Sequence, residues 1–143
     1  MEGRDKKYYD FDYVLDRVSR NAFIAHNNIH LGHVEYDYVE LYCDLTDVSY
    51  NLAGTAHGGL YFSMGDTAAG TAARTDGREY VTQSADVHYI RAATKGRITA
   101  KAKAIHRGRT GCLIDAEVVN EDGEVCFTGR YYFYCVNTLQ VKG

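Results

Sequence analysis

The sequence contains no proline among its 143 residues, so none of its loops is stiffened by the ring of that residue. It also lacks any window of about 18 apolar residues, so no membrane-spanning helix is predicted. The first ten residues, MEGRDKKYYD, are charged and contain no apolar segment, so we expect no secretory signal. Lys and Arg form no long run and the net charge is −3, which argues against nucleic-acid binding. We therefore expect a cytoplasmic protein that binds neither nucleic acid nor membranes.

The sequence also lacks a Cys-x-x-Cys pair, although it contains four cysteines. Each cysteine lies among alternating apolar residues, which is typical of buried, reduced thiols rather than of a disulfide framework or a metal site. The four residues are Cys43, Cys112, Cys126 and Cys135. The length and an ordinary hydrophobic content of 45% predict one domain over residues 1–143.

Two segments before residue 50 show clear periodicity. The helical spacing of apolar residues predicts an amphipathic N-terminal helix over about residues 8–25, with a break near Asn21. Apolar and polar residues then alternate over residues 33–46, but the alternation slips at Tyr38–Val39. We expect a bulge or a turn between two strands there.

An Ala-rich segment predicts a long helix from about Gly58 to Ala73. Its interior contains Gly65 and Gly70, and each glycine costs roughly 1 kcal/mol of helix stability relative to alanine. Small residues at such positions usually let another backbone come close. We therefore expect a sheet to wrap around this helix.

The remaining segments alternate in the manner of strands. In the first of them, the alternation places Thr82 and Ser84 on one face and Gln83 and Ala85 on the other. Residues 107–109 and 120–124 have the composition of hairpin turns. Short turns between strands favour an antiparallel sheet, so the fold class is α+β, with a sheet packed on one helix.

The start of the central helix, His57-Gly58-Gly59, suits the binding of a negatively charged atom. The first turn of a helix has unpaired backbone N–H groups with partial positive charge, and glycine lets a ligand approach them. These N–H groups could form an oxyanion hole for a carbonyl under attack. Alternatively, the glycines only form a tight loop, and His57 only caps the helix.

Asp66 is a lone carboxylate in the middle of this Ala-rich helix. A carboxylate in such surroundings suits a nucleophile or a general base, although a structural Asp or one facing water fits the pattern as well. Gly58 and Asp66 are eight residues apart, or ~12 Å along the helix. Asp66 therefore cannot serve the helix start of its own chain, and a site that uses both must be shared by two chains in a symmetric dimer.

The pattern Asn51–x–x–Gly54–x–x–His57–Gly58–Gly59, followed by Asp66, resembles the hotdog-fold acyl-CoA thioesterases, and most closely those of the PaaI type. The resemblance covers about residues 21–136. It implies a sheet curled around the central helix and a homodimer, often paired into a homotetramer.

By position, the resemblance assigns the oxyanion site to Asn51 and the Gly58 N–H, with His57 and Gly59 beside them. It assigns the role of nucleophile or general base to Asp66 of the other chain. Thr82 falls where the family often has a Ser or Thr that positions the water or the carboxylate, with Gln83 and Ser84 as alternatives.

The resemblance also implies that coenzyme A is the leaving group and that no metal or organic cofactor is needed. Three basic residues are candidates for its phosphates, or else are solvated strand ends: Arg91, Arg107 and Arg109. Two family prolines are replaced, by Leu52 and Ala92, which puts loop rigidity and substrate fit in doubt.

Two other functions remain open at this point. Some hotdog proteins are enoyl-thioester hydratases or dehydratases, which would add water without releasing a thiol. Others bind acyl-CoA without turnover, usually with an attached regulatory domain for which this chain has no spare length. The acyl group is not predicted, because Tyr50, Tyr61 and Tyr89 could line an aromatic pocket or simply be strand residues.

Overall fold

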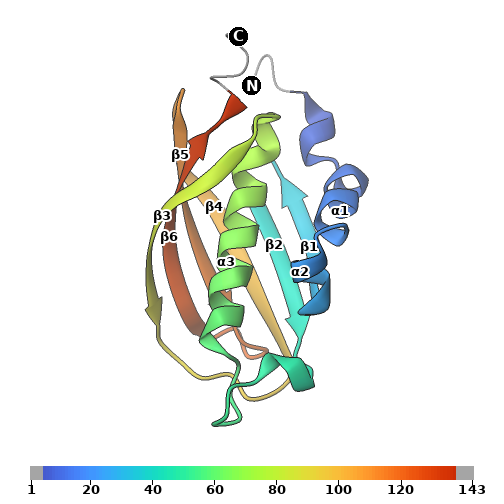
Figure 1. Cartoon of the computed structure of the whole chain (residues 1–143), viewed down its shortest axis with the longest axis vertical. Helices are drawn as coiled ribbons and strands as arrows, with labels where there is room; N and C mark the ends of the chain where they lie inside the picture. Colours follow the sequence, from blue (N-terminus) through green and yellow to red (C-terminus); the bar gives the residue numbers. More distant parts are fainter. Residues whose placement is uncertain (1–4, 138–143) are drawn as a thin grey trace.

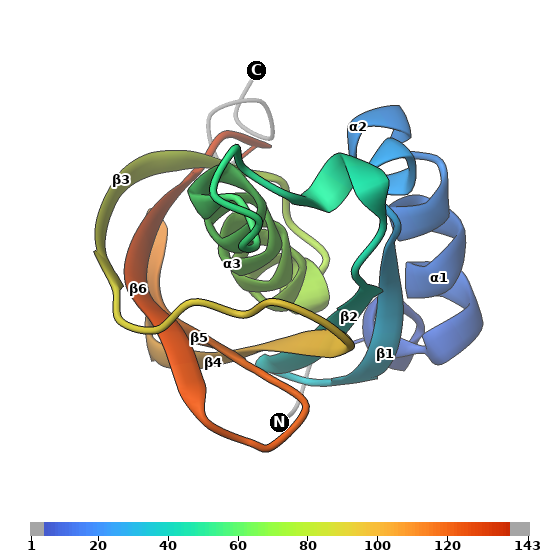
Figure 2. The same ribbon diagram turned by 90° about the horizontal axis from the view of Figure 1, so that it is seen from below.

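A single antiparallel sheet curls around one long helix, α3, as Figures 1 and 2 show from two directions. The computed structural model describes residues 5–137. Within this range the strand order is β1-β2-β4-β5-β6-β3. The strands are β1 (Ile29–Glu35), β2 (Tyr38–Asp44), β3 (Tyr80–Tyr89), β4 (Arg97–Arg107), β5 (Gly111–Val119) and β6 (Val125–Cys135). The predicted α+β class is confirmed.

Helix α3 spans Gly58–Ala73, as predicted, and fills the concave face of the sheet. Its two interior glycines do allow close packing against β6. A Cβ atom on Gly65 would lie 2.7 Å from the Tyr131 hydroxyl, and one on Gly70 would lie 3.2 Å from the Phe133 ring. Real Cβ atoms do not tolerate the first of these contacts, so the helix cost of glycine is offset by a dense core.

The N-terminal segment, predicted to be one helix over about residues 8–25 with a break near Asn21, forms three short helices. They are η1 (Lys6–Tyr9), α1 (Phe11–Ser19) and α2 (Ala22–His26). The break falls at Asn21, whose side chain accepts a hydrogen bond from the Ile24 N–H and so starts a new helix. Val14 and Val18 are buried, and α1 and α2 pack against β1 (Figure 1).

The strand connections follow the sequence pattern. Tyr36 and Asp37 form the turn between β1 and β2, with Asp37 in the left-handed region at φ 64°. Residues 120–124 connect β5 to β6, as predicted, and residues 108–110 connect β4 to β5, one residue later than the predicted 107–109. All four cysteines are buried, and none of them forms a disulfide within residues 5–137.

Strand β3 contains a β-bulge that the alternating pattern did not reveal. Thr82 pairs with Phe133, and the next pair is Ser84 with Tyr132, so Gln83 is the extra residue. The bulge shifts the phase of the strand by one residue. As a result Thr82 lies on the same face as Ala85, which pairs with the buried Tyr131, and the predicted facing of Thr82 is wrong.

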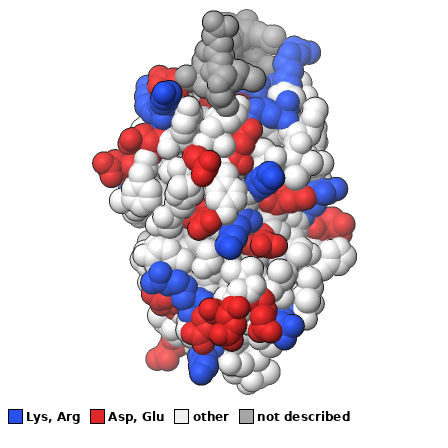
Figure 3. Space-filling view, turned by 180° about the vertical axis from the view of Figure 1, so that it is seen from behind, with Lys and Arg blue, Asp and Glu red and all other residues white. Residues whose placement is uncertain are grey.

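The two edges of the sheet are covered differently. Strand β1 lies under α1 and α2, whereas β3 pairs only with β6 and is exposed over nearly its whole length. Figure 3 shows the outer face of the sheet, where side chains of both charges are mixed. Arg130 and Asp115 form one of the cross-strand ion pairs on this face, at 2.6 Å.

Candidate active site

His57 caps the N-terminus of α3. Its Nδ1 accepts a hydrogen bond from the Gly59 N–H at 2.8 Å, so His57 holds the neutral tautomer with the proton on Nε2. The Gly59 N–H is therefore already used, and Gly59 does not offer the predicted donor to a substrate. Within residues 5–137, no acceptor pairs with the N–H of Gly58. Gly58 is thus the unpaired donor at the positive end of the helix.

The ring of Tyr89 lies directly over Gly58. A Cβ atom on Gly58 would be 3.2 Å from Cε1 of this ring, so a side chain could fit only if the ring moved. Tyr89 ends β3, is half exposed, and packs edge-on against Phe127 with ring centres 5.3 Å apart. The close approach of this aromatic ring favours glycine here.

Asn51 closes the loop before α3. Its Oδ1 accepts hydrogen bonds from the Ala53 and Thr55 N–H groups at 3.0 and 3.1 Å, and its Nδ2 donates to the Thr55 hydroxyl at 2.9 Å. These three hydrogen bonds fix the loop before α3 from within. An amide nitrogen carries two protons, so one proton of Asn51 remains for a ligand. Leu52, which occupies the family's proline position, is fully exposed at the tip of the loop.

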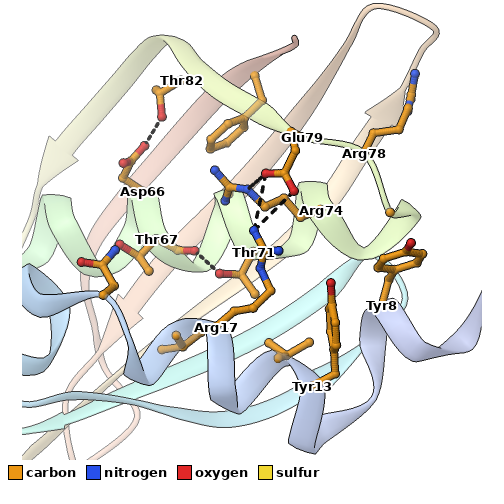
Figure 4. A pocket seen from close by; sticks show the side chains of 16 residues that line it. Tyr8, Tyr13, Arg17, Asp66, Thr67, Thr71, Arg74, Arg78, Glu79 and Thr82 are labelled. Carbon is orange, nitrogen blue, oxygen red and sulfur yellow. Dashed lines mark hydrogen bonds and ion pairs between the residues drawn. The ribbon is translucent and has the colours of Figure 1, made fainter. Parts of the chain in front are cut away.

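Asp66 lies half-buried in the middle of α3, and its partner is Thr82. The Thr82 hydroxyl donates to Oδ1 of Asp66 at 2.6 Å, as Figure 4 shows. The bulge at Gln83 makes this contact possible because it turns Thr82 toward the helix. The structure does not bring Gln83 or Ser84 to Asp66. No described residue donates a hydrogen bond to Oδ2, which is left for a substrate or a water.

Tyr131 of β6 packs beneath Asp66. Burial, together with the negative charge of Asp66, raises the pKa of the Tyr131 phenol. The phenol therefore stays neutral, and its hydroxyl donates to the Phe62 carbonyl at 3.1 Å. This bond ties β6 to the turn of α3 that precedes Asp66.

A cavity of about 320 Å³ opens beside Asp66, between α1, α3 and the start of β3 (Figure 4). Asp66 and Thr82 lie at one end, and charged residues line the other: Arg17, Arg74, Arg78 and Glu79. The sequence reasoning missed this charged end. Helical spacing could have indicated it, because Asp66, Gly70 and Arg74 recur every four residues on one face of α3.

The structure places Arg107, a predicted phosphate contact, among partners within the protein. Its side chain is only 15% exposed and contacts Asp37 and Asp76 at 2.6 Å each. It also donates to the carbonyls of Ala72 and Ala73, at 3.1 and 2.9 Å, and so caps the C-terminus of α3. Two acidic residues remote in sequence bury Arg107 against the helix end, so its side chain is engaged within the protein instead of lying solvated at a strand end.

The charges of this cluster stabilise one another. Burial alone would lower the pKa of the Arg107 guanidinium, but the hydrogen bond to Asp37 and the charge of Asp76 raise it above its usual value. Burial alone would raise the pKa of Asp76, but hydrogen bonds from Tyr80 and Arg78 and the charge of Arg107 lower it below the usual range. Each ion therefore remains charged inside the protein.

The other two predicted phosphate contacts lie at opposite ends of α3. The Arg91 carbonyl accepts from the hydroxyl of Tyr61, in the first turn of the helix. The Arg109 carbonyl accepts from Arg78, which follows the end of the helix. Both side chains are exposed. Within a single chain they do not form one phosphate site.

The described range, 5–137, contains no helix that is long and apolar enough to cross a membrane. In the same part of the chain, no group of three or more His, Cys, Asp or Glu residues gathers in a way that could hold a metal ion.

Comparison with known proteins places the chain in a family. The sequence profile of the thioesterase superfamily matches residues 53–127, more than half of the chain. Among solved structures, the thioesterase HI1161 of Haemophilus influenzae has a TM-score of 0.84 and 20% identity, over 94% of this chain and 95% of that one.

Two more structures share the fold. The PaaI protein of Escherichia coli, from the phenylacetic acid degradation operon, has a TM-score of 0.80 and 20% identity, over 89% of this chain and 96% of its own. A hypothetical thioesterase of Streptococcus pneumoniae, solved with coenzyme A, has a TM-score of 0.79 and 24% identity, over 85% and 96%. The fold and the sequence profile agree with the PaaI-type resemblance. This chain therefore belongs to the thioesterase superfamily and is a thioester hydrolase with the hotdog fold.

Proposed function

We propose that the chain hydrolyses an acyl-CoA thioester to a free acid and coenzyme A, at a site built from two copies of the chain. One observation carries the proposal. The unpaired Gly58 N–H and the available Asp66 oxygen are both on α3, eight residues or ~12 Å apart. Both must lie about 3 Å from the reacting groups, so they cannot act on one thioester within the same chain.

Only one of the two possible relative directions of the α3 helices in a twofold dimer brings Gly58 and Asp66 together. If the two copies of α3 ran parallel, Gly58 would face Gly58 and Asp66 would face Asp66. Antiparallel helices instead bring Gly58 of each chain beside Asp66 of the other, with the axis near the midpoint, Phe62. The exposed edge of β3 supports the same arrangement, because a long uncovered edge strand otherwise invites aggregation.

The chemistry follows from the two halves. The Gly58 N–H, with the remaining amide proton of Asn51, would hold the thioester oxygen as negative charge develops on it. Asp66 of the other chain would attack the carbonyl carbon itself, or take the proton of a water that attacks it. In either case the C–S bond breaks and coenzyme A leaves as the thiol. Where Asp66 attacks directly, a water then hydrolyses the acyl–Asp66 anhydride, which releases the free acid and restores the carboxylate. Thr82 holds the carboxylate in place through Oδ1, and His57 positions the helix start.

Coenzyme A as the leaving group is supported by the Streptococcus pneumoniae structure, which was solved with that molecule. Arg91 and Arg109 remain the proposed phosphate contacts, and antiparallel helices would bring Arg91 of one chain near the Arg109 end of the other. We leave Arg107 out of the proposed phosphate site, because its buried guanidinium is engaged by Asp37 and Asp76. The reaction needs only water as a second substrate, so we propose no metal or organic cofactor.

The test is a panel of acyl-CoA substrates with aryl, short and long acyl groups, followed by thiol release. We expect release well above the uncatalysed rate for at least one substrate. Hydration of an enoyl-CoA without thiol release would instead indicate a hydratase. Tight binding with the thioester intact after long incubation would indicate a binding module.

A further inference from the structure

We propose that the preferred acyl group carries a carboxylate at its far end, and that Arg17 and Arg74 bind this carboxylate. The inference rests on the proposed function, since it concerns the acyl group of the same thioester. It is carried by the cavity beside Asp66, whose far end is lined by charged side chains from α1, α3 and the segment before β3.

The far end of the cavity has a surplus of positive charge. Among residues 5–137, Arg17 and Arg74 share one counter-ion, Glu79, at 3.4 Å from each. These contacts are longer than the 2.7–2.9 Å of a strong charge-assisted hydrogen bond. Two guanidinium groups and one carboxylate leave one positive charge uncompensated, which is complementary to one carboxylate on a substrate.

Both arginines keep donors available. Arg74 has five N–H protons, of which the described structure uses one toward Glu79 and one toward the Tyr80 carbonyl. Figure 4 shows the guanidinium groups of Arg17 and Arg74 converging on Glu79 at the wall of the cavity. The geometry therefore offers a planar fork of donors to a further carboxylate.

Arg78, in the same wall, provides the contrast. Its guanidinium donates to Asp76, to the Gly108 carbonyl and to the Arg109 carbonyl at 2.6–2.9 Å. All three of its nitrogens have short partners, so Arg78 fixes the β4–β5 turn and offers little to a substrate. The two loosely held arginines are the ones that remain for binding.

The position of Arg74 sets the length of the acyl group. Its Nη1 lies 3.0 Å from where a Cβ on Gly70 would be, so the guanidinium folds back over the turn of α3 at Gly70. Gly70 is four residues, or ~6 Å of helix axis, from Asp66. About five carbon–carbon bonds span that distance, which corresponds to a six-carbon dicarboxylic acyl group. The volume of about 320 Å³ is at the small end for ligand sites and also favours a short acyl group.

The test compares kcat/KM for adipoyl-CoA and hexanoyl-CoA, which have equal chain lengths and differ in the terminal carboxylate. We expect the wild type to favour adipoyl-CoA by roughly tenfold or more. Arg74→Gln and Arg17→Gln should each lower this ratio by roughly tenfold, because each removes a donor and a charge. Glu79→Gln should raise the ratio, because it removes the competing carboxylate.

Arg130→Gln is the matched control, since it makes the same charge change on the outer face and should leave the ratio as in the wild type. A wild-type ratio at or below one overturns the inference. The inference is also overturned if the three cavity variants have lower melting temperatures but the same ratio as the wild type. In both cases hexanoyl-CoA hydrolysis would leave the proposed function intact. If no CoA thioester is hydrolysed, the proposed function fails first and takes this inference with it.

Discussion

The two ends of helix α3 are satisfied to very different degrees. At the C-terminus, Arg107 donates to the last carbonyls and is itself held by two carboxylates. At the N-terminus, His57 uses the Gly59 N–H, but the Gly58 N–H has no partner in residues 5–137. The C-terminal end, whose last carbonyls accept hydrogen bonds from Arg107, has a structural role. At the N-terminal end a ligand can accept the hydrogen bond of the Gly58 N–H. Binding there is favourable, because an unmade hydrogen bond costs free energy until a ligand arrives.

The same contrast separates two carboxylates, one at the C-terminal end of α3 and one in its middle. Asp76, at the C-terminal end, is tied to Arg107, Arg78 and Tyr80 and is almost inaccessible. Asp66, in the middle of the helix, has one oxygen held by Thr82 and one available. Accessibility and incomplete bonding, rather than the presence of a charge, distinguish the catalytic candidate from the structural residue.

The largest expected effect comes from removing the Arg107 cap at the C-terminus of α3. Arg107→Met leaves Asp37 and Asp76 without their shared cation and removes a helix cap, so we expect a loss of about 3–5 kcal/mol in the free energy of unfolding. Urea denaturation at a fixed protein concentration measures it. Arg130→Met, on the exposed outer face, should cost less than about 1 kcal/mol. Equal losses of stability for the two variants would show that the Arg107 cap at the C-terminus of α3 stabilises the fold no more than an exposed ion pair does.

The next effect is on catalysis. Asp66→Asn keeps the shape of the side chain and its bond to Thr82, but removes the negative charge that attack or proton transfer requires. We expect kcat to fall by roughly 10²-fold or more with little change in melting temperature. Thr82→Val, which only frees the carboxylate, should cost roughly tenfold. Asp86→Asn, on β3 but facing away from α3, is the control. Turnover of the Asp66 variant within a few-fold of the wild type would remove Asp66 from the chemistry.

Blocking the Gly58 N–H at the N-terminus of α3 should lower activity less than removing the Asp66 carboxylate does. Gly58→Val places methyl groups beside the free N–H and against the Tyr89 ring, so we expect kcat/KM to fall about tenfold or more. The double variant Gly58→Val with Tyr89→Ala relieves the contact with the ring but still blocks the N–H. Recovery of activity in the double variant would mean that the ring contact, and not access to the donor, caused the loss.

The smallest effect concerns pH. The pKa of Asp76 is lower in the folded state than in the unfolded chain, so its contribution to stability is present at neutral pH and is lost as the pH falls through about 4 and below. Asp76→Asn should therefore lose less stability than the wild type between pH 7 and pH 3. Parallel stability curves for the two proteins across that range would contradict the assignment.

Local pattern predicted the helix at the centre of the fold well. The bounds of α3 and the role of Gly65 and Gly70 could be inferred because a glycine inside an apolar helix usually marks the close approach of a neighbouring element. The position of Asp66 on that helix, and its ~12 Å separation from Gly58, followed from helix geometry alone.

The parts that depended on pairing or on remote partners could not be predicted. The bulge at Gln83 reverses the facing of Thr82, and no alternation within β3 reveals where an extra residue sits. The sequence suggested that Arg107 is a phosphate contact or a solvated strand end. Its burial could not be predicted, because Asp37 and Asp76, which bury it, are 70 and 31 residues away in sequence. Arg17 comes from a helix outside the region that the family profile matches, so the resemblance did not indicate the far wall of the cavity.

The most direct test of the account is complementation between inactive chains. One chain carries Asn51→Ala with Gly58→Val, and the other carries Asp66→Asn, so each homodimer has two broken sites. Chains with different tags are unfolded and refolded together, and the mixed dimers are isolated. In a mixed dimer one site collects every defect, and the other is wholly wild type. Random association gives about half mixed dimers, so the unfractionated mixture should recover roughly a quarter of wild-type activity per chain. Mixed dimers that are verified by both tags and remain as inactive as either parent would contradict a site shared between two chains.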